Sequence, residues 1–193
     1  MNSLRAQITE SQKVRSDLMK WKLFIIAAIG TTGLGLGNFK FSNARMVLCL
    51  IPPVAVYVDA LCAHLSLRIK AIGEFITSLQ PLNKSDLHLK NYELFLRLSP
   101  PKFKLETIAL HWSTIFVSAL VLLYGYSDFP SPMVVKLPLL GECPGAILFY
   151  ASGILGITLT IGVLLFVKRR SRIISECAQK IIDDSGKISV EAS

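Results

Sequence analysis

The chain has 193 residues, enough for one domain, and 52% of them are hydrophobic while 18% are charged. Ordinary soluble domains have about 25% charged residues, and the mean hydropathy here is +0.52, so a soluble fold would have to hide four long apolar runs in one small core. The formal net charge of +8 suggests nucleic acid as a partner, but the placement of the charges, described below, argues against it. The composition therefore predicts an integral membrane protein.

Residues 1–20 are polar and carry a narrow apolar stripe at three- and four-residue steps. This spacing predicts an amphipathic helix on the cytoplasmic side. A solvated helix beside the membrane and a helix that docks on a partner both fit the stripe, and its narrowness favours the first. Because a polar segment precedes the first apolar run and no small-residue cleavage site clearly follows it, no cleavable signal peptide is expected.

The first expected span is residues 21–37, WKLFIIAAIGTTGLGLG. Lys22, with its neighbours in the KWK sequence, is expected to anchor this span at the membrane interface. The glycines of the span recur with helical spacing on one face, which lets another helix approach closely. We therefore predict helix packing at three positions: Gly30, Gly33 and Gly37.

The second expected span, residues 46–65, is twenty residues long. As a helix it would be about 30 Å long, the thickness of the hydrocarbon core of a bilayer. Asp59 and His64 are its ionisable groups apart from tyrosine and cysteine. The helix is expected to continue past the membrane as far as Gln80, since the next residue is a proline.

The pair Pro52-Pro53 lies inside this second span. Proline has no N–H group, so two backbone carbonyls, those of Leu48 and Cys49, lose their usual helical partners. Lipid cannot satisfy a carbonyl. We therefore predict that a neighbouring helix or a trapped water donates to them.

Residues 66–105 are expected to form a cytoplasmic helical loop, with a second helix over residues 85–98 that begins at a serine N-cap. The third and fourth spans are predicted over residues 107–126 and 145–167. The tail, residues 168–193, should begin as a basic helix and end in the disordered sequence SGKISVEAS. On the fourth span, small residues recur on one face, and we predict helix packing there through Ser152, Gly156 and Thr160.

With these four spans, only Lys40, Arg45 and Lys136 fall on the outer side, so that 18 of the 21 lysines and arginines lie on the other side. This asymmetry is the positive-inside pattern, and it predicts that both termini are cytoplasmic. Topology and attraction to anionic lipid account for most of the basic excess. Nucleic acid is therefore not expected as a partner.

An ionisable residue inside a span is a functional candidate, because placing it there costs about 2.5–3.5 kcal/mol. Asp59 and His111, the latter on a polar line of the third span, are expected at depths that differ by roughly 3 Å. Such a pair could relay protons, gate a pore or lock two helices together, and for Asp59 the functional and the structural roles are equally supported. His64 is expected to be interfacial.

The remaining candidates for chemistry are few. Cys49 and Cys143 both fall near the expected outer face and could pair, although nothing in their spacing demands it. The sequence has no GxSxG, no HExxH and no cluster of ligands at metal spacing. We therefore expect no catalytic residue, no metal and no cofactor.

Two stretches carry a resemblance: the sequence from Gln12 to Gly37, and PPVAVYVDALCAHLSLRIKAIGEF, which begins at Pro52. They resemble an uncharacterised family of small bacterial four-span integral membrane proteins. The first hairpin, to about residue 80, is also similar in architecture to the SLATT membrane domains of bacterial conflict systems, which have two spans. The resemblance implies a bacterial cytoplasmic membrane and carries no assigned activity.

We therefore expect an all-α, integral membrane four-helix protein of the bacterial inner membrane, with cytoplasmic helical extensions. The predicted function is non-enzymatic: a self-associating anchor, sensor or permeabilising component of a larger system, for example a defence system. The alternative is a small ion channel or transporter that uses Asp59 and His111, and the third possibility is a membrane enzyme. Expected partners are the lipid bilayer, further copies of the chain, and a cytoplasmic protein bound through residues 1–20, 66–105 or 168–193.

Overall fold

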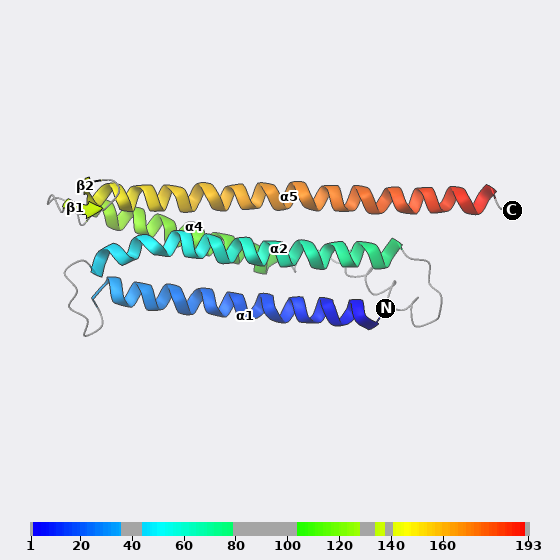
Figure 1. The fold of residues 1–193 in the computed structure, drawn as a ribbon, viewed down its shortest axis with the longest axis horizontal. Helices are drawn as coiled ribbons and strands as arrows, with labels where there is room; N and C mark the ends of the chain where they lie inside the picture. Colours follow the sequence, from blue (N-terminus) through cyan, green and yellow to red (C-terminus); the bar gives the residue numbers. More distant parts are fainter. Residues whose placement is uncertain (1, 36–43, 79–103, 128–133, 138–140, 192–193) are drawn as a thin grey trace.

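The computed structural model describes residues 2–35, 44–78, 104–127, 134–137 and 141–191. These residues are almost entirely helical (Figure 1). A 3-10 helix, Ala44–Leu50, leads directly into α2, and a short antiparallel pair of strands precedes α5. The helices and strands are α1 (Asn2–Gly33), α2 (Ile51–Ser78), α4 (Lys104–Ser127), β1 (Val134–Leu137), β2 (Gly141–Pro144) and α5 (Gly145–Glu191).

The helices form one elongated bundle in which α2 is central. α2 packs against α1, α4 and α5, and α4 also packs against α5. Figure 1 shows α1 and α5 on opposite sides of α2, with α4 behind, and the strand pair at the end of the bundle away from both chain termini. The two ends of the chain therefore lie at the same end of the bundle.

Among the described residues, three helical segments are long and apolar enough to cross a membrane: Arg45–Ile76, Ile108–Tyr126 and Gly145–Lys180. The expected first span is not among them. In α1 the apolar part after Lys22 runs from Leu23 to Gly33, about eleven residues or roughly 16 Å at helical rise, half of a bilayer core. The structure thus supports a membrane protein with three such helices, and the predicted count of four is not confirmed.

The outer surface of the bundle is apolar on every helix. Trp21 is 59% exposed on α1, Phe116 is 63% exposed on α4 and Leu165 is 63% exposed on α5, and many other large hydrophobic side chains are exposed with them. Soluble proteins rarely expose contiguous apolar surface on this scale. The surface is the one expected of helices that face lipid.

Several predicted helix boundaries can be compared with the structure. α2 runs past the apolar stretch to Ser78, as predicted, whereas the helix expected over residues 85–98 lies outside the described residues. α5 continues to Glu191, although the sequence predicted a disordered end. That segment has no proline and one glycine, which costs a helix only about 1 kcal/mol.

The double proline lies in the first turn of α2, because Pro52 and Pro53 are the second and third residues of that helix. The first N–H groups of a helix have no intrahelical partner, so proline is tolerated there. The preceding 3-10 helix therefore enters α2 without a proline in the interior of the α-helix.

Two apolar clusters lie in the bundle. One contains Leu48, Ile51, Val121 and Phe149, and it lies near the strand pair, where α2 and α5 begin. The other joins Val58, Cys62 and Leu110, with Leu18 and Met19 of α1 packed against it. The candidate site is built beside this second cluster.

Candidate functional site

Lys22 lies inside the bundle rather than at its surface. Its side chain is 2% exposed, whereas Trp21 is 59% exposed and Lys20 pairs with Asp17 on the outside, at 3.3 Å. Residues two apart on a helix point about 200° away from one another, so the KWK sequence cannot place both lysines at one surface. The predicted interfacial role of Lys22 is therefore wrong.

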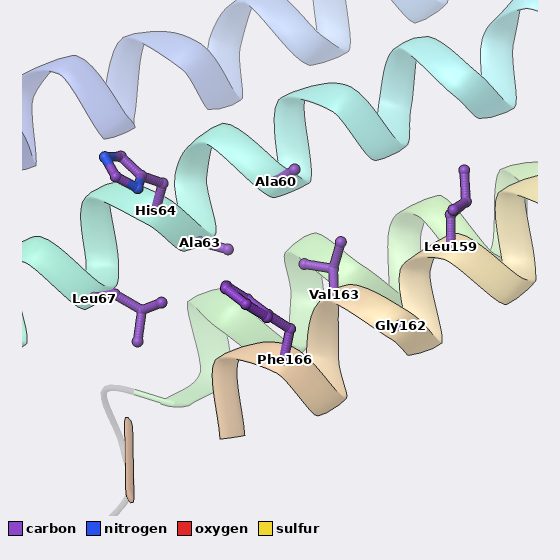
Figure 2. Close-up of a pocket in the computed structure, with 8 residues that line it drawn as sticks. All are labelled: Ala60, Ala63, His64, Leu67, Leu159, Gly162, Val163 and Phe166. Carbon is purple, nitrogen blue, oxygen red and sulfur yellow. The ribbon is translucent and has the colours of Figure 1, made fainter. Parts of the chain in front are cut away.

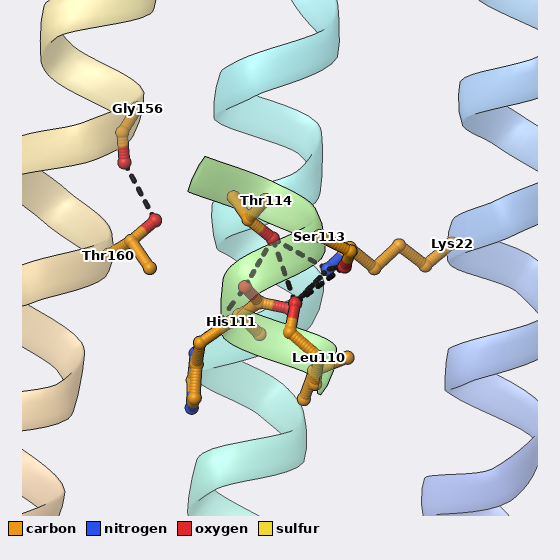
Figure 3. A network of polar contacts seen from close by, with 8 residues as sticks. Lys22, Leu110, His111, Ser113, Thr114, Gly156 and Thr160 are labelled. Atoms are coloured by element: carbon orange, nitrogen blue, oxygen red, sulfur yellow. Dashed lines mark hydrogen bonds and ion pairs between the residues drawn. The ribbon is translucent and has the colours of Figure 1, made fainter. Parts of the chain in front are cut away.

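The ammonium group of Lys22 lies within hydrogen-bond distance of four oxygen atoms (Figure 3). It forms an ion pair with Asp59 Oδ1 at 2.7 Å and donates to Thr114 Oγ1 at 2.6 Å. The carbonyl oxygen of Leu110 lies at 2.9 Å and Ser113 Oγ lies at 3.1 Å. An ammonium has three protons, so these acceptors saturate it, and the contact joins α1, α2 and α4 at one point.

The carboxylate of Asp59 is fully buried and has a donor on each oxygen. Oδ1 accepts from Lys22, and Oδ2 accepts from Thr114 Oγ1 at 2.5 Å. Thr114 thus donates to Asp59 while its own oxygen accepts from Lys22, which closes a triangle of three helices. We call Lys22, Asp59, Ser113, Thr114 and the Leu110 carbonyl the lysine cluster.

His111 lies at the edge of the lysine cluster. Its ring is 3% exposed, and Nδ1 is 3.5 Å from Asp59 Oδ2. This distance is within ion-pair range but exceeds that of an ordinary hydrogen bond, and Nδ1 has no hydrogen bond within the described part of the chain. The structure therefore brings the two predicted residues together, but Asp59 has a closer partner in Lys22.

The lysine cluster pairs one positive and one negative charge in a bundle whose α2 segment is apolar enough to cross a membrane. One buried charge alone would be costly, while an opposite charge and a full set of hydrogen bonds offset much of that cost. Loss of one member of a buried pair is expensive because it leaves the other charge uncompensated. The chemistry that the arrangement offers most directly is a lock between helices.

His64 is not part of the cluster. It is exposed on α2 and lines a groove between α2 and α5 (Figure 2). Its expected interfacial position stays a prediction.

Two of the predicted packing glycines contact other elements closely. A Cβ atom at Gly33 would lie 2.5 Å from side-chain atoms of Leu48, and one at Gly156 would lie 2.5 Å from Ser118 Oγ and 2.6 Å from Pro52 Cβ. Gly156 therefore lets α2 and α4 meet α5. Gly30 has no such neighbour within 4 Å among the described residues, and Gly37 lies outside them.

The hydroxyl groups of the predicted α5 face make two different hydrogen bonds. Ser152 Oγ donates to the carbonyl of Cys49, one of the two carbonyls that the double proline leaves without a helical partner. That prediction of a donor from a neighbouring helix is confirmed for Cys49. Thr160 Oγ1 is fully buried and donates within its own helix to the Gly156 carbonyl at 2.7 Å. Cys49 has a free thiol in the structure.

Sequence reasoning missed several residues that the structure brings into play. Gly125 packs on Phe149, and Gly153 packs on Leu122. Gly153 precedes Gly156 by one helical turn, and that spacing is a usable signal. The burial of Lys22 could have been predicted from the angle of about 200° between Lys20 and Lys22 around the helix axis. Nothing in the sequence distinguishes Ser113 from an ordinary serine.

The part of the chain that the structure describes contains no group of three or more histidine, cysteine, aspartate or glutamate residues that could hold a metal ion. The cluster also lacks the donor set that hard or transition metals prefer, since its centre is already a cation.

Comparison of the chain with protein-family models, with curated proteins and with solved structures gives no match.

Proposed function

We propose that the chain is a non-enzymatic four-span protein of a bacterial cytoplasmic membrane that acts as the anchor or sensor of a larger system. The observation that carries this proposal is the saturation of Lys22. All of its protons have acceptors within the bundle, and both oxygens of Asp59 have donors. An intramembrane acid held in this way supports a role in fixing helices more than a role in carrying an ion.

In this proposal α1 completes a fourth crossing together with residues beyond Gly33, and both termini are cytoplasmic. The common position of the two chain ends in Figure 1 and the excess of lysine and arginine on one side support this topology. Reporter fusions at residues 42 and 136 should then read as periplasmic. A cytoplasmic signal from residue 136 would contradict the topology.

The surface offered to a cytoplasmic partner is a stalk, by which we mean residues 66–78 of α2 and 168–180 of α5. Hydrogen bonds join its helices: Lys70 Nζ donates to the Ser171 carbonyl at 2.8 Å and to Ser171 Oγ, and Ser175 Oγ donates to Glu74 Oε1 at 3.3 Å. Both helices enter the stalk from the membrane without a break. A displacement inside the membrane would therefore move the stalk, which is what a sensor needs.

Self-association requires a surface that does not depend on Gly33 or Gly156. Gly33 and Gly156 are occupied by contacts within the chain, so they are not available to a second copy. The exposed apolar side of the bundle remains for that purpose.

The test is ion flux in liposomes that contain the purified protein. The anchor proposal expects a flux equal to that of empty vesicles, with bundle stability lost when Lys22 is replaced. A flux that Asp59→Asn abolishes in a still-folded protein would contradict it.

The second candidate is a small channel or transporter, and His111 is the observation that favours it. Its buried Nδ1 lies 3.5 Å from the carboxylate oxygen that Thr114 also contacts. The His111 imidazole would compete with Lys22 for Asp59, and such competition is a way to open a locked cluster. Ion permeation that depends on both Asp59 and His111 would favour this candidate. The same result would favour a component that permeabilises the membrane within a larger system.

A further inference from the structure

A groove of about 300 Å³ lies between α2 and α5, and none of its described lining residues belongs to the lysine cluster. Figure 2 shows the side chains of Ala63 and Leu67 on α2 facing those of Val163 and Phe166 on α5 across it. Small and apolar side chains make up most of its lining, and His64 is the ionisable residue there.

The groove is open because several of the side chains that line it are small. Ala60, Ala63 and Gly162 contribute little volume, and a Cβ atom at Gly162 would meet none of the described residues within 4 Å. A void between helices loses dispersion contacts on both walls. In a bilayer the surrounding lipid chains can enter it, and an apolar groove suits a flexible acyl chain.

The end of the groove nearer the stalk is basic. The guanidinium of Arg170 lies 5.5 Å from the ring centroid of Phe166, which lines the groove. This cation–π contact holds Arg170 one helical turn beyond the groove. A second hollow, of about 420 Å³, lies on another face of the same helix and is lined by Lys168, Arg169 and Arg172. Neither hollow has an acidic residue among its described lining residues.

The depth of these groups matches a lipid rather than a soluble ligand. Phe166 is near the end of the apolar stretch of α5, and the basic residues begin two positions later. The groove thus lies at the level of acyl chains, and Arg170 lies where the headgroups of the cytoplasmic leaflet begin.

We propose that this groove is a binding site for an anionic phospholipid, with one acyl chain between α2 and α5 and the phosphate on Arg170. Charge complementarity selects the anionic headgroup, since each lysine or arginine near a membrane surface attracts acidic lipid. The lipid would bridge the two helices that continue into the stalk.

The test is a titration of the detergent-solubilised protein with dioleoylphosphatidylglycerol or dioleoylphosphatidylcholine, with bound lipid counted by native mass spectrometry. We expect the phosphatidylglycerol to bind at least about fivefold more tightly. Arg170→Gln should reduce that preference by about fivefold, the factor that corresponds to about 1 kcal/mol per charge. Lys13→Gln removes an exposed cytoplasmic-side charge on α1 and should leave the preference unchanged.

A second pair of variants tests the groove itself. Gly162→Leu places a side chain in open space within the groove and should weaken the binding of both lipids. Gly30→Leu is the matched control, because it too has no described neighbour within 4 Å but lies outside the groove.

Three results would overturn the proposal. The first is equal affinity for the two lipids, and the second is an Arg170→Gln variant that behaves like Lys13→Gln. The third is a Gly162→Leu variant that binds lipid normally but loses a dimer, which would assign the groove to a second copy of the chain. None of these results depends on whether the protein is an anchor or a channel.

Discussion

The two sides of α2 are held to their neighbours by opposite means. Toward α1 and α4 the contact is a buried charge, in which Lys22 and Asp59 lie 2.7 Å apart. Toward α5 the contact depends on a missing side chain, since Gly156 lets Pro52 and Ser118 approach. The first contact fails when a group is removed, and the second fails when a group is added. A membrane bundle can therefore combine a polar lock with close apolar packing on one central helix.

The largest expected effect is that of removing the lysine. Lys22→Met leaves Asp59 buried without its counter-charge, and breaking a buried pair costs about 3–5 kcal/mol. We expect the free energy of unfolding to fall by this amount, measured in mixed micelles of a mild detergent and dodecyl sulfate.

The double variant Lys22→Met, Asp59→Leu is the control for this prediction. Replacing a whole buried pair by apolar side chains is often neutral, so the double variant should be more stable than either single variant. Additive losses would mean that the two charges do not interact and would contradict the lock.

The second effect is steric. Gly156→Leu puts a side chain where even a Cβ atom would lie 2.5 Å from Ser118 Oγ. Overpacking of this kind costs about 1–3 kcal/mol or more, and we expect a lower midpoint in the same unfolding experiment. Gly30→Leu, with open space around it, should be neutral or slightly stabilising. Equal tolerance at the two glycines would remove Gly156 from the α2–α5 contact.

The third effect is smaller and concerns the double proline. Ser152→Ala removes the donor to the Cys49 carbonyl, and we expect a loss of about 0.5–1.5 kcal/mol. Thr158→Ala is the matched control, because Thr158 Oγ1 donates to the Ile154 carbonyl of its own helix and is exposed. If the Ser152 variant loses no more stability than the Thr158 variant, the hydrogen bond to the Cys49 carbonyl contributes no more than an ordinary one within a helix.

The sequence predicts most of the contacts between α2 and α5. Small residues at helical spacing indicated Gly156 and Ser152, and the missing N–H of Pro53 indicated an orphan carbonyl at Cys49. Both signals are local, because they follow from the geometry of one helix. The open space at Gly30 could not be predicted, since it depends on where the neighbouring helices lie.

On the charged side of α2, the sequence predicts Asp59 and His111 but not the partner Lys22. The cost of an acid in a span identified Asp59, and depth identified His111 as a neighbour. A lysine beside a tryptophan at the start of a span usually lies at the membrane interface, so the sequence predicts that position for Lys22. Its true partner depends on the rotation of α1 about its axis, and that is a tertiary property. The count of four spans is not confirmed, since three helical segments of the described residues are long and apolar enough to cross a membrane.

The smallest expected effect separates the two partners of Asp59. Nδ1 of His111 lies 3.5 Å from the carboxylate, while the Lys22 ammonium lies 2.7 Å from it. Double-mutant cycles of His111→Gln with Asp59→Asn should give a coupling energy of about 0.5 kcal/mol or less, near the limit of additivity. The Lys22–Asp59 cycle should give a much larger value, because that contact is shorter and fully hydrogen bonded. If His111 instead couples as strongly as Lys22, the carboxylate is shared between two partners. Asp59 would then be a switch point rather than a lock, and the channel would become the better account of this bundle.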